Sequence, residues 1–201
     1  MKKQLSTLTP GTQFLYRERG AVVLQHTGGG VFVQLMDSIG QYRFGATNDW
    51  RTSELRKYLN HTFAKELCEC NLDELLDTVT DLTAMDGTTD YGYSVDKLTL
   101  LTVDQCRKYR YTRSLLKEGW GEWTSTPDGT PSTPSANGNS FAWYLNDEGI
   151  MLSNNSTHTV GARPAFTLLS SLTVKVLSHQ CFAGFTDADL LCELLRRQAR
   201  K

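Results

Sequence analysis

The segment TSTPDGTPSTPSANGNS, residues 124–140, constrains the fold most, because it is either a tether between two domains or a loop within one. It contains three of the five prolines and eight serine or threonine residues. This composition favours irregular, exposed backbone. A tether would have a separate core on each side, whereas the apolar runs of 141–177 are typical of strands that complete a core begun earlier in the chain. We therefore interpret 124–140 as a loop within one domain.

The composition is that of an ordinary globular protein, with 201 residues, 39% hydrophobic and 21% charged. The net charge of -1 gives no overall attraction to nucleic acid or to an anionic membrane, and neither is predicted as a partner. No apolar run approaches the roughly 20 residues of a membrane span. The N-terminal MKKQLSTLTPGTQF has no apolar core of a signal peptide, so synthesis in the cytoplasm is expected, with a place in a phage particle left open.

The first half of the chain alternates between strand and helix signals. Two apolar runs flank the glycines of 28–30, which predicts a hairpin with a plain turn rather than a phosphate loop. A helix is predicted over 48–63, with Asp49 as its N-cap and Leu55, Leu59 and Phe63 on one face. Trp50, at the helix entrance, is expected to anchor the helix to the sheet.

Further elements are assigned from the same patterns. A second short helix is predicted within 70–82, a surface loop over 85–96, a strand over 97–102, and a helix opened by a capping box of Thr102 and Gln105. Strands are predicted at 141–145, 149–153, 164–169 and 172–177. The C-terminal residues 186–201 predict an amphipathic helix with a leucine stripe and a basic end, which either docks on its own domain or contacts a partner.

Four segments in order resemble one family: NDWRTSELRKYLNHTF, DKLTLLTVDQCRKY, WTSTPDG and GARPAFTL. They are similar to a bacterial and phage domain of unknown function related to the C-type-lectin-like fold. More distantly, that fold resembles the formylglycine-generating enzymes and the variable proteins of diversity-generating retroelements. The resemblance covers about residues 8–177. It implies a single α+β domain of C-type-lectin-like fold, with twisted antiparallel sheets, two main helices and long loops, followed by the extension 178–201.

Single residues of the family pattern can be carried over. Matches in the helix are Ser53, Leu55, Arg56, Leu59 and Asn60, with Tyr58 in place of the usual tryptophan; matches elsewhere are Asp96, Lys97, Gly161, Arg163, Pro164 and Ala165. The chain departs from the family at Ser125, where the family has an arginine.

The resemblance implies a core that includes Trp123 and Arg163. Pro164 holds Arg163 extended, and a buried arginine needs an acid or carbonyls as partners. Trp50, Trp123, Arg163 and Pro164 are therefore expected to be structural.

No catalytic residue, metal site or cofactor is predicted. The cysteines, at 68, 70, 106, 181 and 192, lack disulfide or zinc spacing, and none lies between 123 and 180, where oxidases of the wider fold carry a pair. The four histidines are scattered, and no nucleophile elbow or dinucleotide loop occurs. A divergent metal-dependent enzyme of the formylglycine-generating fold stays open as an alternative, as does a homo-oligomeric assembly protein formed through the C-terminal helix.

The leading interpretation is a non-enzymatic module, encoded by a phage or prophage, that is structural or that binds a glycan or protein receptor on a cell surface. Short hydroxyl and amide side chains beside aromatic residues suit adaptable recognition, and the variable proteins place diversified residues in the corresponding region. The predicted ligand-binding residues are Ser125, Asp128, Asn137, Asn139, Trp143, Tyr144, Asn154, Asn155 and His158.

Overall fold

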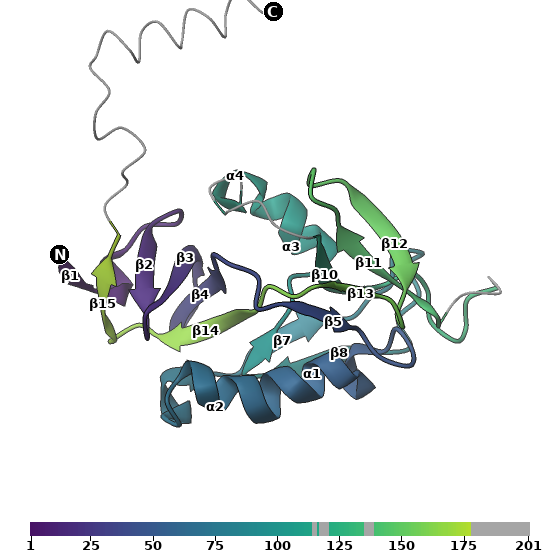
Figure 1. Cartoon of the computed structure of the whole chain (residues 1–201), viewed down its shortest axis with the longest axis horizontal. Coiled ribbons are helices and arrows are strands. Elements are labelled where there is room, and N and C mark those ends of the chain that lie inside the picture. The colour runs from purple at the N-terminus through teal and green to yellow at the C-terminus, as the bar shows by residue number, and fades with distance from the viewer. Residues whose placement is uncertain (114–115, 117–120, 135–138, 178–201) are drawn as a thin grey trace, which may run out of the picture.

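The structure is a computed structural model that describes residues 1–113, 116, 121–134 and 139–177. The described chain is α+β, with mostly antiparallel curled sheets and few helices (Figure 1). The predicted C-terminal helix and Asn137 lie outside the described residues. The strands are β1 Lys2–Gln4, β2 Gln13–Tyr16, β3 Arg19–His26, β4 Gly30–Leu35, β5 Gln41–Arg43, β6 Leu75–Leu76, β7 Thr78–Asp81, β8 Tyr93–Asp96, β9 Leu98–Thr99, β10 Glu122–Pro127, β11 Phe141–Leu145, β12 Met151–Asn155, β13 Thr159–Gly161, β14 Ala165–Leu169 and β15 Thr173–Val176.

The strands form three sheets. The largest has the order β1-β15-β2-β3-β4-β14-β6, with β9 also paired to β14. The second has the order β12-β11-β10-β13-β5, and β7 and β8 form a two-stranded ribbon. Among the described strands, only β10 and β13 pair in parallel. The first strand of the large sheet begins at Lys2, before the predicted domain boundary at residue 8.

One helical run lies along one side of the molecule and a shorter pair of helices lies on the opposite side (Figure 1). The long run consists of α1 Glu54–Tyr58, a π-helical turn Leu59–Phe63 and α2 Ala64–Leu67; the shorter pair is α3 Val103–Lys108 and α4 Arg110–Arg113. Short 3₁₀ turns occupy Leu5–Thr7, Trp50–Thr52 and Leu72–Glu74.

The predicted helix faces and caps are largely present. Leu55, Leu59 and Phe63 are at most 2% exposed, as their spacing predicts. Asp49 caps the 3₁₀ turn, but extended Ser53 interrupts the run and becomes the cap of α1. The capping box at the start of α3 is confirmed, because Thr102 and Gln105 exchange both bonds. The hairpin over the glycines of 28–30 is also confirmed.

Two predictions for residues 70–96 were wrong. The segment 70–82 contains only a 3₁₀ turn and the strands β6 and β7, and the predicted loop over 85–96 ends in β8. The β-branched residues of β7 favour an extended backbone. Thr78 and Thr80 turn inward, where their hydroxyls lie 2.9 Å from those of Thr167 and Thr99. These long-range hydroxyl pairs select the strand over the helix.

The core contains residues from both sides of 124–140. A single cluster includes Phe14 and Val33 of the large sheet, Leu55 of the helix, Trp123 of β10 and Phe166 of β14. The polar segment is not one loop, however, because its first residues, 124–127, belong to the buried strand β10. The chain on both sides of the polar segment therefore packs into one core.

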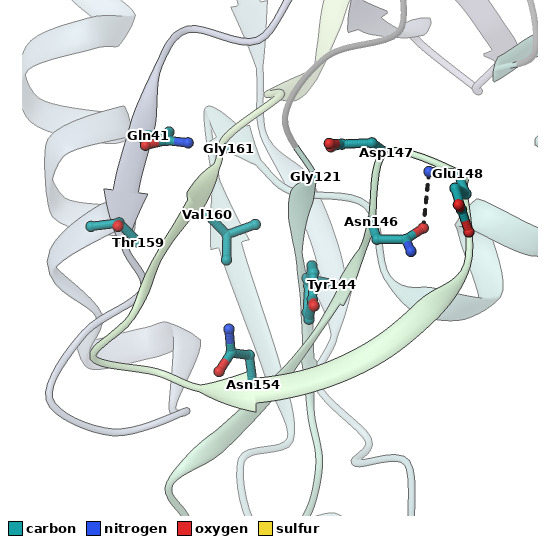
Figure 2. Close-up of a pocket in the computed structure, with 10 residues that line it drawn as sticks. All are labelled: Gln41, Gly121, Tyr144, Asn146, Asp147, Glu148, Asn154, Thr159, Val160 and Gly161. Carbon is teal, nitrogen blue, oxygen red and sulfur yellow. Dashed lines mark hydrogen bonds between the residues drawn. The ribbon is translucent and has the colours of Figure 1, made fainter.

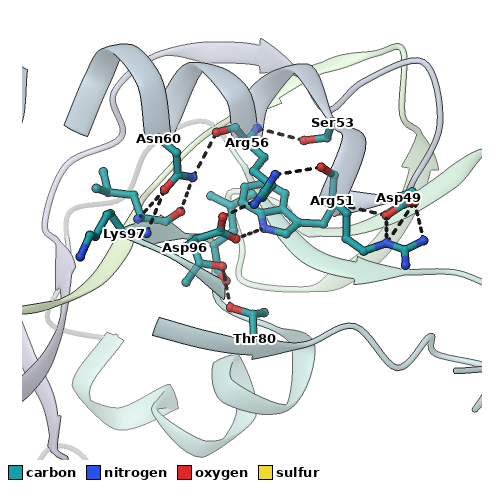
Figure 3. Close-up of polar contacts among 12 residues, drawn as sticks. Asp49, Arg51, Ser53, Arg56, Asn60, Thr80, Asp96 and Lys97 are labelled. Carbon is teal, nitrogen blue, oxygen red and sulfur yellow. Dashed lines mark hydrogen bonds and ion pairs between the residues drawn. The ribbon is translucent and has the colours of Figure 1, made fainter. Parts of the chain in front are cut away.

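A polar network fixes the long helical run to the strands (Figure 3). Asp96 of β8, with its side chain 1% exposed, lies 2.7 Å from Nε of Arg56 and accepts a 3.0 Å hydrogen bond from Nε1 of Trp50. The Asn60 amide donates to the Leu98 carbonyl and accepts from the backbone N–H of Lys97. Trp50 is fully buried. The start of the helix is therefore held by buried hydrogen bonds as well as by apolar packing.

Candidate functional site

A groove crosses the five-stranded sheet between the β11–β12 hairpin and β13 (Figure 2). Its volume of about 570 Å³ lies within the range of small-molecule sites. The groove is lined by Gln41 from the first half of the chain and by residues between 121 and 161 from the second half. The lining residues are Gln41, Gly121, Tyr144, Asn146, Asp147, Glu148, Asn154, Thr159, Val160 and Gly161.

Gly121 allows the start of β10 to approach the β11–β12 turn closely at one wall of the groove. A Cβ at this position would lie 2.5 Å from the Leu145 carbonyl oxygen and 3.1 Å from Cα of Asn146. The two segments therefore approach more closely than any side chain allows. Glu122, the next residue, pairs with Leu145 of β11 and with Gly161 of β13, which ties both walls to the same point of β10.

Tyr144 supplies the aromatic surface of the groove. Its ring contacts Trp123 edge-on, with centroids 5.9 Å apart. Trp123 is itself 2% exposed and donates from Nε1 to the Tyr42 carbonyl at 2.9 Å. A buried, hydrogen-bonded tryptophan therefore fixes the orientation of the half-buried tyrosine.

Short polar turns position the amides of the groove. The side-chain oxygen of Asn146 accepts hydrogen bonds from the N–H groups of Glu148 and Ile150, which closes the β11–β12 turn. On β12, the side-chain oxygen of Asn154 accepts from the Asn155 N–H and lies 2.7 Å from Nδ1 of His158. These hydrogen bonds hold the side-chain oxygens of Asn146 and Asn154 in place. They therefore also fix the direction in which the NH₂ group of each side chain points.

The groove combines an aromatic ring with hydrogen-bonding groups and negative charge. It contains three amides, one threonine hydroxyl and the carboxylates of Asp147 and Glu148, and none of its described lining residues is Lys, Arg or His. Such a set can donate to and accept from hydroxyl groups while a ring face contacts an apolar surface. Among the described lining residues no cation balances these two carboxylates, which disfavours an anionic ligand.

Of the predicted ligand-binding residues that the structure describes, two, Tyr144 and Asn154, line this groove. Trp143 alternates with Tyr144 along β11 and so faces the other side of the sheet. There its Nε1 donates to Oδ1 of Asp128 at 2.8 Å. Ser125 was predicted as a ligand-binding residue, but it is fully buried, and its hydroxyl donates to the Leu100 carbonyl. Ser125 is buried because residues 124–127 belong to strand β10, all of whose residues are buried.

The remaining predicted residues are distributed over the surrounding turns. Asn155 closes the turn after β12 by accepting from the N–H and hydroxyl of Thr157, and His158 is exposed beside it. Asn139 is exposed, and its carbonyl accepts from the N–H of buried Asn48. Several lining residues, including Gln41, Asp147, Glu148 and Thr159, were not predicted. For Asp147 and Glu148, the polar run NDEG at residues 146–149 was the sequence feature that could have indicated them.

Residues 128–134 are docked against the loop 85–91 rather than held away from the surface. Oδ2 of Asp90 accepts from the Thr130 hydroxyl at 2.7 Å and from the Ser132 N–H at 2.8 Å. Asp86 accepts from the hydroxyls of Thr133 and Thr88. Most described hydroxyls of this polar segment therefore serve the fold, which removes them as ligand-binding groups.

Asn48 holds both ends of the docked segment. Its side-chain NH₂ donates to the carbonyls of Gly129 at 2.9 Å and Phe141 at 2.7 Å, and its oxygen accepts from the Tyr91 hydroxyl at 2.8 Å. The side chain is fully buried. This amide therefore satisfies backbone groups that the loop would otherwise bury without partners.

The docking of 128–134 is expected to weaken in acid. Hydrogen bonds, first from Thr133 and then from Thr88, lower the pKa of Asp86, and the hydroxyl of Thr130 is the main cause of the lowered pKa of Asp90. A carboxylate with a lowered folded-state pKa contributes stability above its ordinary value, about 3.9, and loses it as the pH falls through the lowered value. The melting temperature of Asp90→Asn should therefore lie below that of the wild type at neutral pH and converge with it in acid.

Thermal unfolding at a series of pH values measures this difference. Asp73→Asn, at an exposed carboxylate outside the docked segment, controls for a general change of charge. A gap between Asp90→Asn and wild type that stays constant from neutral to strongly acid pH would contradict the expectation.

Arg163 lies in a buried ionic cluster with Glu122, the residue that follows Gly121 of the groove. Its Nε is 2.8 Å from Oε2 of Glu122, and its terminal nitrogen donates to the Met36 carbonyl. Arg113 contacts the other carboxylate oxygen of Glu122 and donates to the side chain of Gln34 at 3.2 Å. Burial lowers the pKa of both guanidinium groups, and the charge of Arg163 lowers the pKa of Arg113 further.

Pro164 is also buried, and its carbonyl oxygen accepts a hydrogen bond from the Leu35 N–H.

Within the described part of the chain, no three histidine, cysteine, aspartate or glutamate side chains gather as metal ligands do. No described helix is both long and apolar enough to cross a membrane. Comparison of the chain with protein-family models, curated proteins and solved structures finds no match.

Proposed function

We propose that this chain is a non-enzymatic recognition module with a C-type-lectin-like fold, from a phage or prophage, that binds a neutral or amine-bearing glycan in the groove of the five-stranded sheet. The observation that carries the proposal is the combination of one oriented aromatic ring, three amides and two carboxylates around a floor that contains Gly121.

The chemistry of sugars matches this lining. A pyranose has an apolar ring face, which an aromatic side chain can cover, and a rim of hydroxyls that both donate and accept hydrogen bonds. Tyr144 supplies the ring, and Asn154 and Thr159 supply polar groups from opposite walls. The position of Tyr144 is set by buried Trp123, so little side-chain freedom is lost when a ligand binds.

The charge of the groove restricts the class of glycan. Asp147 and Glu148 lie at the β11–β12 turn, and the described lining residues supply no cation to balance them. A sialylated or phosphorylated sugar would place like charges together, whereas a neutral sugar or one with an ammonium group would not.

A glycan array followed by titration calorimetry tests the proposal. The double change Asn154→Ala/Thr159→Val should weaken binding about tenfold or more, because two hydrogen bonds to the ligand are lost. Tyr144→Ala should weaken it at least as much, since the ring contact is removed. Melting temperatures separate lost binding from lost folding.

Matched controls use residues outside the groove. Ser153 lies on the other face of β12, next to Asn154, and Tyr111 is 74% exposed on α4. Ser153→Ala and Tyr111→Ala should bind like the wild type. If the protein binds no neutral or amino glycan on the array, the proposal is wrong. Binding of a cell-surface protein at the groove would also contradict it, because the ligand would then belong to a different class.

A further inference from the structure

The β7–β8 ribbon presents an apolar face to solvent. Val79 and Val95 lie directly opposite each other, and Tyr93 lies opposite Asp81. Their exposed fractions are 62% for Val79, 55% for Val95 and 67% for Tyr93. The alternate residues of the same strands, including Thr80 and Asp96, are buried.

This exposure is concentrated rather than scattered. Of the eight exposed large hydrophobic side chains among the described residues, four lie within residues 79–95, Met85 being the fourth. Val79 also lines a cavity of about 270 Å³ together with Phe32 and Leu76. A contiguous exposed apolar face beside a cavity marks an interaction surface more often than a single exposed residue does.

The charges around the ribbon indicate what kind of partner fits. Asp77 and Asp81 are both exposed, and Asp77 forms a 2.9 Å ion pair with Lys97 at the edge of the ribbon. Two ribbons packed face to face would bring the Asp81 carboxylates of both copies toward each other, which is unfavourable. An apolar segment with cations beside it would match the face better.

The C-terminal sequence of this chain has that character. Residues 186–201 contain the leucines 190, 191, 194 and 195 at helical spacing and end in three arginines and a lysine. The leucines match the three apolar side chains of the ribbon, and the cations match the carboxylate of Asp81.

The sheet order favours the segment of a second copy over that of the same chain. The described chain ends beyond β15, near one end of the large sheet, whereas β6, which leads into the ribbon, lies at the other end. The tail of the same chain would have to cross the width of this sheet to reach the ribbon, whereas the tail of a second copy can approach the ribbon from outside.

We infer that the β7–β8 ribbon binds the C-terminal segment 186–201 of a second copy of this chain, so that the protein self-associates through ribbon and tail. This surface is separate from the groove, and the inference does not rest on glycan binding.

Two full-length variants test the inference by complementation. The ribbon variant Val79→Thr/Tyr93→Thr/Val95→Thr keeps an intact tail and retains strand-forming side chains. The tail variant Leu190→Asp/Leu194→Asp keeps an intact ribbon. In sedimentation velocity, the wild type should associate with rising concentration, and each variant alone should dissociate about tenfold more readily or stay monomeric. An equimolar mixture should associate, because it restores one intact ribbon and one intact tail.

A milder variant and a control keep the test decisive. Asp81→Lys reverses a charge at the ribbon and removes the hydrogen bonds that Asp81 accepts from Thr83, and it should also weaken association. Tyr111→Thr removes an exposed ring elsewhere and should leave association unchanged. Circular dichroism checks that every variant is folded. A wild type that stays monomeric throughout, or a folded ribbon variant that associates like the wild type, overturns the inference.

Discussion

Replacing Glu122 with glutamine is expected to lower the free energy of unfolding by about 3–5 kcal/mol, the usual cost of breaking a buried ion pair. The carboxylate is shared by two buried guanidinium groups, with its oxygens on Arg113 and Arg163. The side chains of both arginines are at most 10% exposed, so water cannot replace the lost negative charge. The amide would leave two positive charges near each other with one neutral group between them.

Urea denaturation at neutral pH measures this change. Glu66→Gln, at an exposed glutamate of α2, is the matched control and should alter stability by no more than about 0.5 kcal/mol. A loss below about 1 kcal/mol for Glu122→Gln would show that the cluster is compensated by other partners or by solvent.

The same residue connects the stability of the core to the shape of the groove. Glu122 follows Gly121 in the groove and pairs with Leu145 and Gly161, which belong to the two facing walls. Arg163 follows Gly161 by two residues, so the ionic cluster holds both β10 and the end of β13. A change at Glu122 should therefore loosen the groove as well as the core, and the groove variants proposed above touch no member of this cluster.

Local signals in the sequence predicted the elements whose stabilising contacts are local. The spacing of Leu55, Leu59 and Phe63 specifies a buried face within one helix, and Thr102 and Gln105 cap a helix by contacts three residues apart. The ribbon was missed because its strands are selected by distant partners. The hydroxyls of Thr78 and Thr80 are satisfied by threonines of β14 and β9, which a local pattern does not reveal.

The candidate site was predicted less completely for a related reason. Composition indicated that residues 124–140 and their neighbours are polar, but not which hydroxyls are used by the fold. Ser125 is inside the sheet, and Thr130 and Thr133 bind the carboxylates of a loop 40 to 47 residues away in sequence. Tyr144 and Trp143 are adjacent and equally aromatic, and only the pairing of β11 with its neighbours decides which one faces the groove.

Replacing Asp96 with alanine should lower the free energy of unfolding by about 2–4 kcal/mol. The carboxylate is 1% exposed, and it binds both the indole N–H of Trp50 and the guanidinium group of Arg56. Its loss leaves the Trp50 N–H buried without an acceptor. The Arg56 side chain is 29% exposed, so water compensates part of the lost ion pair and keeps the cost below that at Glu122.

The matched control is Asp77→Ala, because Asp77 forms an ion pair with Lys97 of similar length, 2.9 Å, but is 65% exposed. Its removal should cost no more than about 1 kcal/mol. A double-mutant cycle with Trp50→Phe, which removes the N–H and keeps a ring, separates the Trp50 contribution from that of Arg56. A coupling energy of about 0.5–3 kcal/mol between positions 50 and 96 is expected. Strictly additive effects would mean that the buried hydrogen bond does not hold the helix entrance, and that apolar packing of Trp50 alone positions it.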